Sequence, residues 1–368
     1  MINQSTTSSR LGYLDSVRGI AALMVFVGHY MNWEFAESHT MKVASIFFNG
    51  NDAVSFFFVL SGLVLAYPYV QLDKGLDIGK FYVARVFRIF PAYWVALLIN
   101  TAYSTRYEIR SRQGLLDIFI LNKKEFWNEA LLIRGFNHFY IPGWTLTIEM
   151  CSSFLMPFLI LIPMRNRKLL PWLLLASFLC INITGIFLVH FVLGVYIAYY
   201  FKEIQADGFK QTKAYKYRVP LLLIAALFFV LRQIDRASPL GSTLIYTMDS
   251  LKVDFFILSG LAAFIFLVFL IHSKKAQRFF EHPVLIFYGK ISYGVYLMHW
   301  VFVWAMGDNW ALKLVPLFPN KYVAFFTVLF VCFVLTTISA TLLHYIVELP
   351  FIKLAKRLTA KMKPTVSI

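Results

Sequence analysis

Three ionisable residues interrupt the first apolar stretch of the chain, namely Asp15, Arg18 and His29. Arg18 and His29 are 11 residues apart, so in an α-helix they lie on one face, separated by three turns and roughly 16 Å. Asp15 precedes Arg18 by one turn and can pair with it, which leaves a purely structural ion pair as the alternative. An imidazole can accept a proton or carry an acyl group, and a guanidinium can bind phosphate. We therefore expect one helix to present both groups.

Two further titratable residues, Glu149 and His299, lie in later apolar stretches. Counting about 1.5 Å per residue from the expected helix ends places both at a depth similar to that of His29. Ionisable groups in a bilayer are costly unless they are paired or hydrated, so each is a candidate functional residue. A histidine beside a carboxylate would make a general base with an orienting partner. For His299, packing beside Tyr296 and Trp300 is the alternative.

Arg85 and Arg88 are spaced to point the same way from a helix just before the third apolar stretch, next to Pro91. A pair of guanidinium forks suits phosphate. The alternative is a routine basic end of a cytoplasmic helix. The isolated His190 and His344 are assigned to packing or to the membrane interface.

The composition excludes a water-soluble globule and a disordered chain. Of 368 residues, 59% are hydrophobic and 15% charged, and the mean hydropathy is +0.66. Soluble domains are about 45–50% apolar and about 25% charged. The 35 Lys and Arg against 19 Asp and Glu indicate basic cytoplasmic loops rather than nucleic-acid binding. The chain is therefore predicted to be a polytopic membrane protein.

About ten apolar stretches are long enough to be candidate spans of an all-α membrane bundle. They cover residues 14–33, 52–71, 88–104, 143–163, 168–184, 186–201, 219–232, 251–271, 284–305 and 322–347. We expect a single domain over residues 1–368, with a membrane core at about 10–352 and a basic cytoplasmic tail at 353–368.

The charges of the connections predict the orientation. Lys and Arg gather in alternate connections and in the tail, as cytoplasmic segments do. The exception is the 105–142 connection, which is expected outside although it carries charges of both signs. Both termini are then expected in the cytoplasm. No cleavable signal peptide is expected, because Asp15 and Arg18 interrupt the first apolar run.

Six sequence runs occur in the order and spacing typical of one family of membrane enzymes. They are LDSVRGIAALMVFVGHY (14–30), SFFFVLSGLVLAYP (55–68), FYVARVFRIFPAYW (81–94), PGWTLTIEMCSSFLMP (142–157), KISYGVYLMHW (290–300) and HYIVELPF (344–351). Through these runs the chain resembles the acyltransferase-3 family of integral membrane acyltransferases. Two mild departures are Ser16, where glycine is frequent, and Thr145, where serine is common.

The resemblance implies transfer of an acyl group, usually acetyl, from cytoplasmic acyl-CoA to a hydroxyl of a glycan or glycolipid precursor. It also implies an enzyme of the stand-alone class in a bacterial inner membrane. His29 matches the catalytic histidine, Arg18 the arginine of the same motif, and Glu149 the acidic position of the fourth span. Arg85 and Arg88 match the pair implicated in donor handling. His299, Tyr293 and Tyr296 match a late motif of less settled role.

The pantetheine arm of coenzyme A is comparable in length to the roughly 16 Å between Arg18 and His29. Phosphates bound at the arginines would leave the thioester near His29. His29 would then act as general base or acyl carrier, and Glu149 would orient its imidazole. Asp15 and Ser61 are assigned to the donor side, although Ser61 can equally serve close helix packing. Trp144 is a candidate for stacking on a sugar or, alternatively, an interfacial anchor.

A transporter or flippase for a lipid-linked or sugar substrate is the main rival. Such carriers usually show internal repeats, and none is evident between residues 1–184 and 186–368. A membrane scaffold or sensor would not explain why His29, Glu149 and His299 lie within the bilayer. No metal site is expected, because these histidines lack partners at ligand spacing. The acceptor and the oligomeric state are not indicated by the sequence.

Overall fold

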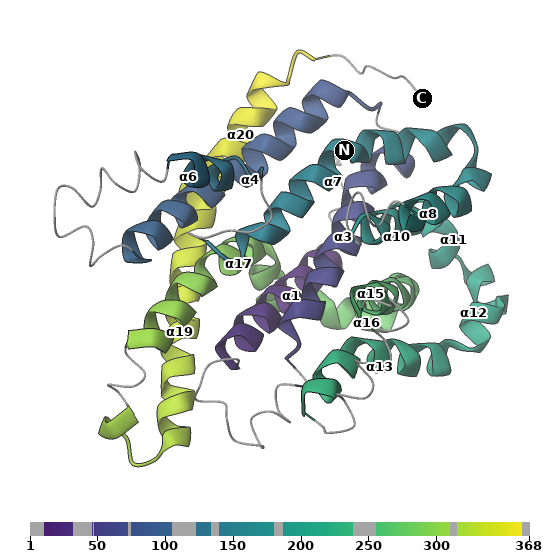
Figure 1. The fold of residues 1–368 in the computed structure, drawn as a ribbon. Coiled ribbons are helices and arrows are strands. Elements are labelled where there is room, and N and C mark those ends of the chain that lie inside the picture. Colours follow the sequence, from purple (N-terminus) through teal and green to yellow (C-terminus); the bar gives the residue numbers. More distant parts are fainter. Residues whose placement is uncertain are drawn as a thin grey trace, which may run out of the picture.

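The computed structural model describes residues 11–31, 46, 48–72, 75–104, 123–133, 140–179, 187–237, 255–309 and 315–362. Over these residues the protein is helical, without a β-strand (Figure 1). The longer helices are α1 (Gly12–Met31), α3 (Gly50–Val70), α4 (Ile78–Ser104), α7 (Gly143–Arg165), α8 (Leu170–Leu179), α10 (Leu188–Tyr199), α13 (Arg218–Ala237), α15 (Phe255–His272), α17 (Pro283–Asn309), α19 (Lys321–Leu343) and α20 (Leu349–Leu358). The shorter elements are α6 (Lys123–Ala130), η3 (Arg167–Leu169), α11 (Phe201–Gln205), η4 (Asp207–Gln211), α12 (Lys213–Lys216), α16 (Lys274–Phe280), η5 (Val315–Leu317) and the π-helical turn η6 (His344–Glu348).

Each of the ten predicted stretches overlaps a helix in the described part of the chain. In the described part of the chain, five segments are long and apolar enough to cross a membrane: Asp52–Val70, Ile78–Tyr103, Gly143–Arg165, Phe255–His272 and Lys321–Leu358. The other five stretches fall on α1, α8, α10, α13 and α17. The described parts of α8 and α10 have only 10 and 12 residues, whereas a lone span needs about 20. The protein is therefore an integral membrane protein, while the count of ten spans and the orientation stay predictions.

One predicted boundary is wrong, because α4 begins at Ile78 and not at residue 88. The side chain of Asp77 accepts a hydrogen bond from the backbone N–H of Lys80 at 2.9 Å and so caps the helix. Arg85 and Arg88 consequently lie inside the helix, about two and three turns beyond this cap, instead of in the connection before it. They are thereby directed into the bundle.

Helix α3 is central in the bundle and contacts α1, α7, α10 and α15. Helix α1 packs between α3 and α17, and α4 packs against α7, α17 and α20. Glycines allow the closest of these contacts. Cβ atoms built on Gly62 of α3 and Gly194 of α10 would collide with the backbone of the opposite helix, at Phe191 and Val59 respectively. The backbones of α3 and α10 are thus in direct contact.

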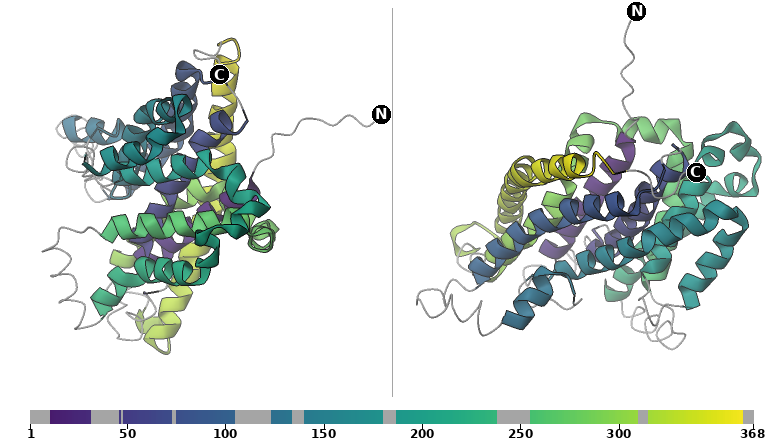
Figure 2. Two further views of the ribbon diagram at one scale, coloured as in Figure 1. Left: turned by 90° about the vertical axis from the view of Figure 1, so that its right-hand side faces the viewer. Right: turned by 90° about the horizontal axis from the view of Figure 1, so that it is seen from above.

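The last three elements form one long rod along an edge of the bundle, drawn in yellow-green to yellow in Figure 2. The rod runs from α19 through the turn η6 into α20, which packs against α4. Phe351 of α20 meets Phe87 of α4 with ring centres 6.3 Å apart. The rod therefore places α20 beside the helix that carries Arg85 and Arg88.

The α3–α10 contact predicts the effect of a single methyl group. Gly62→Ala should destabilise the fold by about 1–3 kcal/mol, because backbone must move to admit the Cβ. The measurement is the temperature at which the detergent-solubilised protein loses its monodisperse elution peak. Gly208→Ala is the matched control, since nothing lies within 4 Å of a Cβ at that position. Equal stability of the two variants would contradict the contact.

Candidate active site

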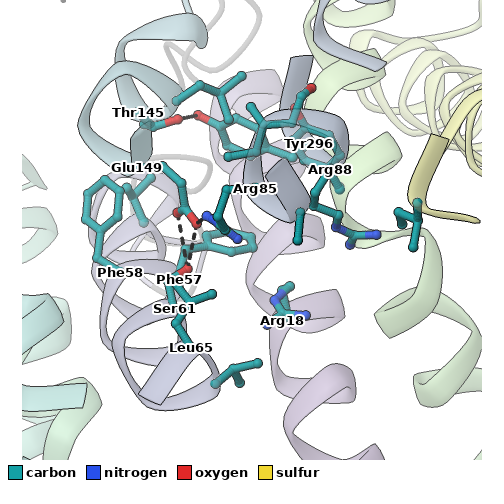
Figure 3. A pocket seen from close by; sticks show the side chains of 17 residues that line it. Arg18, Phe57, Phe58, Ser61, Leu65, Arg85, Arg88, Thr145, Glu149 and Tyr296 are labelled. Carbon is teal, nitrogen blue, oxygen red and sulfur yellow. Dashed lines mark hydrogen bonds and ion pairs between the residues drawn. The ribbon is translucent and has the colours of Figure 1, made fainter. Parts of the chain in front are cut away.

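A cavity of about 420 Å³ opens between α1, α3, α4, α7 and α17 (Figure 3). Its volume lies within the range of about 300–1,000 Å³ that is common for ligand sites. Its polar lining consists of Arg18, Ser61, Arg85, Arg88, Thr145, Glu149, Tyr293 and Tyr296. Apolar side chains, among them Phe57 and Phe58 of α3, complete the wall. The cavity thus combines several cations with an apolar surround.

Arg85 of α4 and Glu149 of α7 form an ion pair inside this cavity. Arg85 Nε also donates a hydrogen bond to Ser153 Oγ at 3.1 Å. The hydroxyl of Ser61, from α3, lies 3.0 and 3.1 Å from the two carboxylate oxygens of Glu149, to which it donates (Figure 3). The pair is largely buried, with side chains 14% and 17% exposed. Three helices are therefore joined around one carboxylate.

The two other arginines of the cavity also have carboxylate partners. Arg18 Nη1 lies 3.3 Å from Asp15 Oδ1 on the same helix. Arg88 Nη1 lies 3.2 Å from Glu348 Oε2 of η6, and its guanidinium stands 5.9 Å from the centre of the Tyr293 ring. Each guanidinium that lines the cavity is therefore paired with one acid.

Tyr296 closes the cavity on the side of α17. Its hydroxyl lies 2.7 Å from Thr145 Oγ1 and donates to the carbonyl of Pro142 at 3.1 Å. Its ring packs between Phe57, at 5.8 Å, and His299, at 5.6 Å, between ring centres. Tyr296 therefore stands between the cationic cavity and the membrane histidines.

His29 and His299 lie side by side, with ring centres 5.2 Å apart in an edge-to-face arrangement. His29 also packs edge-to-face with Trp300, with ring centres 5.2 Å apart. His299 Nδ1 is 2.6 Å from the carbonyl of Tyr296, so this nitrogen carries the proton and Nε2 is the acceptor. His299 Nε2 is buried and has no hydrogen-bond partner among the described residues. Neither histidine lines the cavity.

Most of the predicted site residues come together. The cavity is lined by Arg18, Ser61, Arg85, Arg88, Glu149, Tyr293 and Tyr296, and Asp15 lies beside Arg18. The expected convergence of His29 and His299 is also found. Between described residues, however, Glu149 makes no hydrogen bond to His29, since its carboxylate is engaged by Arg85 and Ser61. The expected orienting contact is therefore replaced by an ion pair.

Trp144 lies outside the cavity. Its ring packs against Phe187 at 5.6 Å and Phe256 at 6.4 Å, between ring centres. This aromatic cluster joins α7 to α15 and to the start of α10. A stacking role for Trp144 on a sugar is therefore not supported by its place in the fold.

Two residues that matter to the site were missed. Glu348 holds Arg88 and also accepts a hydrogen bond from His344, which was assigned to packing or the interface. Glu348 lies one residue beyond the last predicted apolar stretch, so it was not counted among the ionisable residues inside a span. The available signal was an acid inside the run HYIVELPF, directly after apolar residues.

No group of three His, Cys, Asp or Glu side chains suited to a metal ion occurs in the described ranges.

The sequence model of a protein family described as "Acyltransferase domain" matches residues 11–345, which is nearly the whole chain. The chain belongs to the acyltransferase-3 family. All the predicted site residues fall inside the matched range, whereas Glu348 falls just beyond it.

Curated relatives match parts of this acyltransferase-3 chain, and two of the three described next are named for acyl transfer. It is 31% identical over 148 residues to "Acyltransferase MdmB" of Streptomyces mycarofaciens, which covers 38% of this chain and 36% of that protein. It is 36% identical over 97 residues to "Protein 2 in picA locus" of Rhizobium radiobacter, or 24% of this chain and 44% of the relative. It is 23% identical over 181 residues to "Peptidoglycan O-acetyltransferase OatA" of Listeria monocytogenes, or 45% and 27%. The matches thus span less than half of each relative, and no solved structure matches significantly.

The Arg85–Glu149 pair predicts a stability effect that a second substitution reverses. Arg85→Ala leaves a largely buried carboxylate without its cation and should cost about 1–3 kcal/mol. Arg85→Ala/Glu149→Gln removes the stranded charge and should recover most of the loss. The measurement is thermal stability in detergent.

Arg167→Ala is the control, because Arg167 and Glu203 form a half-exposed pair that contributes about 1 kcal/mol or less. A double variant no more stable than Arg85→Ala alone would show that the carboxylate does not depend on Arg85.

Proposed function

We propose that the protein is an integral membrane O-acyltransferase that moves a short acyl group, acetyl in the first instance, from acyl-CoA to a hydroxyl of a carbohydrate or glycolipid acceptor. The observation that carries the proposal is the convergence of Arg18, Arg85 and Arg88 on one cavity of a chain in an acyltransferase family. The names of two relatives, an acyltransferase and a peptidoglycan O-acetyltransferase, support the reaction class and the acceptor class. A bacterial inner membrane is the proposed location.

The arginines would bind the phosphates of the donor. Coenzyme A carries phosphates at one end and its thioester at the other, and guanidinium groups bind phosphate through two parallel hydrogen bonds. Each arginine of the cavity is paired with a carboxylate. Guanidinium N–H groups beyond those used by the carboxylates are the ones available to a phosphate. An anionic ligand forms stronger hydrogen bonds with these groups than an uncharged ligand does, so the cavity favours an anionic donor.

His29 would perform the transfer. It lies three turns, or roughly 16 Å, beyond Arg18 on α1, a span that the pantetheine arm can cover. As general base, its imidazole takes the proton of the acceptor hydroxyl while the oxygen attacks the thioester carbonyl. The carbon–sulfur bond then breaks, and the imidazolium returns the proton to the departing thiolate. A route through an acyl-histidine is the alternative form of the same proposal.

The remaining residues would shape the path of the thioester. Tyr296 and His299 stand between the cavity and His29, so the thioester must pass the Tyr296 ring to reach the imidazole. Glu149, held by Arg85 and Ser61, serves the cavity rather than His29. Asp15 sets the position of Arg18.

The test follows label from radioactive acetyl-CoA into membrane glycan. His29→Ala should lower the transfer by about 10²–10⁴-fold, the usual contribution of a general base, with unchanged protein in the membrane. His282→Ala is the matched control, because His282 is exposed between α16 and α17 and should transfer at the unaltered rate.

Unchanged transfer by His29→Ala would remove the histidine from the mechanism. No transfer by the unaltered protein, with acetyl-CoA or longer acyl-CoA donors, would favour a carrier of lipid-linked or sugar substrates instead.

A further inference from the structure

A short chain of polar contacts ends at Arg88 but begins outside the cavity. His344 Nδ1 lies 3.0 Å from Glu348 Oε2, and the same oxygen lies 3.2 Å from Arg88 Nη1. The Glu348 side chain is fully buried, whereas Arg88 is 31% exposed and lines the cavity. Glu348 itself does not line it. The hydrogen bonds of the carboxylate therefore reach the cavity through Arg88.

The backbone explains why the carboxylate is held so firmly. His344 and Glu348 are the first and last residues of the π-helical turn η6, which links α19 to α20. Such turns are rare and are found frequently at functional sites. The turn contacts α4, the helix of Arg88, and places the acid against it. A buried carboxylate is costly unless it is paired and hydrogen-bonded, and Arg88 and His344 supply these contacts.

Arg88 needs such a partner more than the other arginines of the cavity do. Arg85 is fixed by both Glu149 and Ser153, and Arg18 is partly buried beside Asp15 on its own helix. For Arg88 the described residues provide one hydrogen bond, to Glu348, together with the ring of Tyr293. Fixing a free arginine side chain costs rotamer entropy, and this cost weakens binding if it is paid only when the ligand binds. Glu348 orders the side chain before a ligand arrives.

We propose that Glu348 is a positioning residue, which holds the Arg88 guanidinium for the phosphates of the acyl-CoA donor and is itself held by His344. This inference rests on the proposed function. Nη1 of Arg88 is occupied by the acid, and its other N–H groups stay available to phosphate. Glu348 thereby lowers the positive charge of the cavity but fixes the orientation of the Arg88 guanidinium.

The experiment measures the dissociation constant of acetyl-CoA for the purified protein in detergent. Arg88→Ala and Glu348→Ala should each weaken binding by about tenfold or more, the loss of one charge-assisted hydrogen bond. Glu348→Gln keeps an acceptor oxygen at the same place and should recover part of the affinity. His344→Ala should weaken binding in the same direction, but less.

A double-mutant cycle separates positioning from general structural support. In the Arg88→Ala background, Glu348→Ala should cause no further loss of affinity, because its effect passes through the missing arginine. A carboxylate that merely stabilises the fold would weaken binding in both backgrounds. Glu203→Gln, which alters an exposed arginine–glutamate pair outside the cavity, is the matched control and should bind acetyl-CoA unchanged.

The outcomes distinguish the two proposals. If the unaltered protein does not bind acetyl-CoA, the proposed function fails. If it binds and Arg88→Ala weakens binding, but Glu348→Ala leaves it unchanged or acts equally in both backgrounds, the positioning role is wrong. Should Glu348→Ala not yield monodisperse protein, Glu348→Asp, which is one methylene too short to keep both contacts, enters the same cycle with the same expectation.

Discussion

A guanidinium placed among apolar helices needs a carboxylate nearby, and the arrangement of this bundle follows from that requirement. Arg18 is paired within its own helix, whereas Arg85 and Arg88 of α4 are paired with acids of α7 and η6. The two latter pairs join segments that are far apart in the sequence. Satisfying the charges therefore also fixes α4 between α7 and the terminal rod. In this protein the contacts that assemble the cavity and those that support the fold are the same.

The cavity is consequently polar but balanced in charge. Its three cations are matched by three acids, of which only Glu149 faces the cavity. An anion entering such a site meets directed N–H groups instead of a diffuse excess of positive charge. This arrangement suits phosphate, because its tetrahedral oxygens can accept from guanidinium groups on different helices. The proposed donor selectivity is thus a property of geometry more than of net charge.

The sequence predicts the helices well, because bilayer thickness requires long apolar runs. It also predicts that His29 and His299 share a depth, since rise per residue is constant. Counting residues says nothing about which neighbour a side chain faces, and Glu149 proved to face Arg85 and Ser61. The start of α4 was misplaced because hydropathy ignores the short-range cap made by Asp77. Glu348 was missed because a π-helical turn has no periodic signature and the apolar pattern ends just before it.

That irregular turn has an effect at the end of the chain. One extra residue in a turn rotates everything after it by about 100° relative to a continuous α-helix. The rotation directs Phe351 of α20 toward Phe87 of α4 and leaves Lys353, Lys356 and Arg357 exposed. The turn that holds the buried Glu348 thus also sets the rotation of α20 about its own axis. Removing one residue from the turn would displace the Glu348 carboxylate. It would also rotate Lys353, Lys356 and Arg357 to another side of α20.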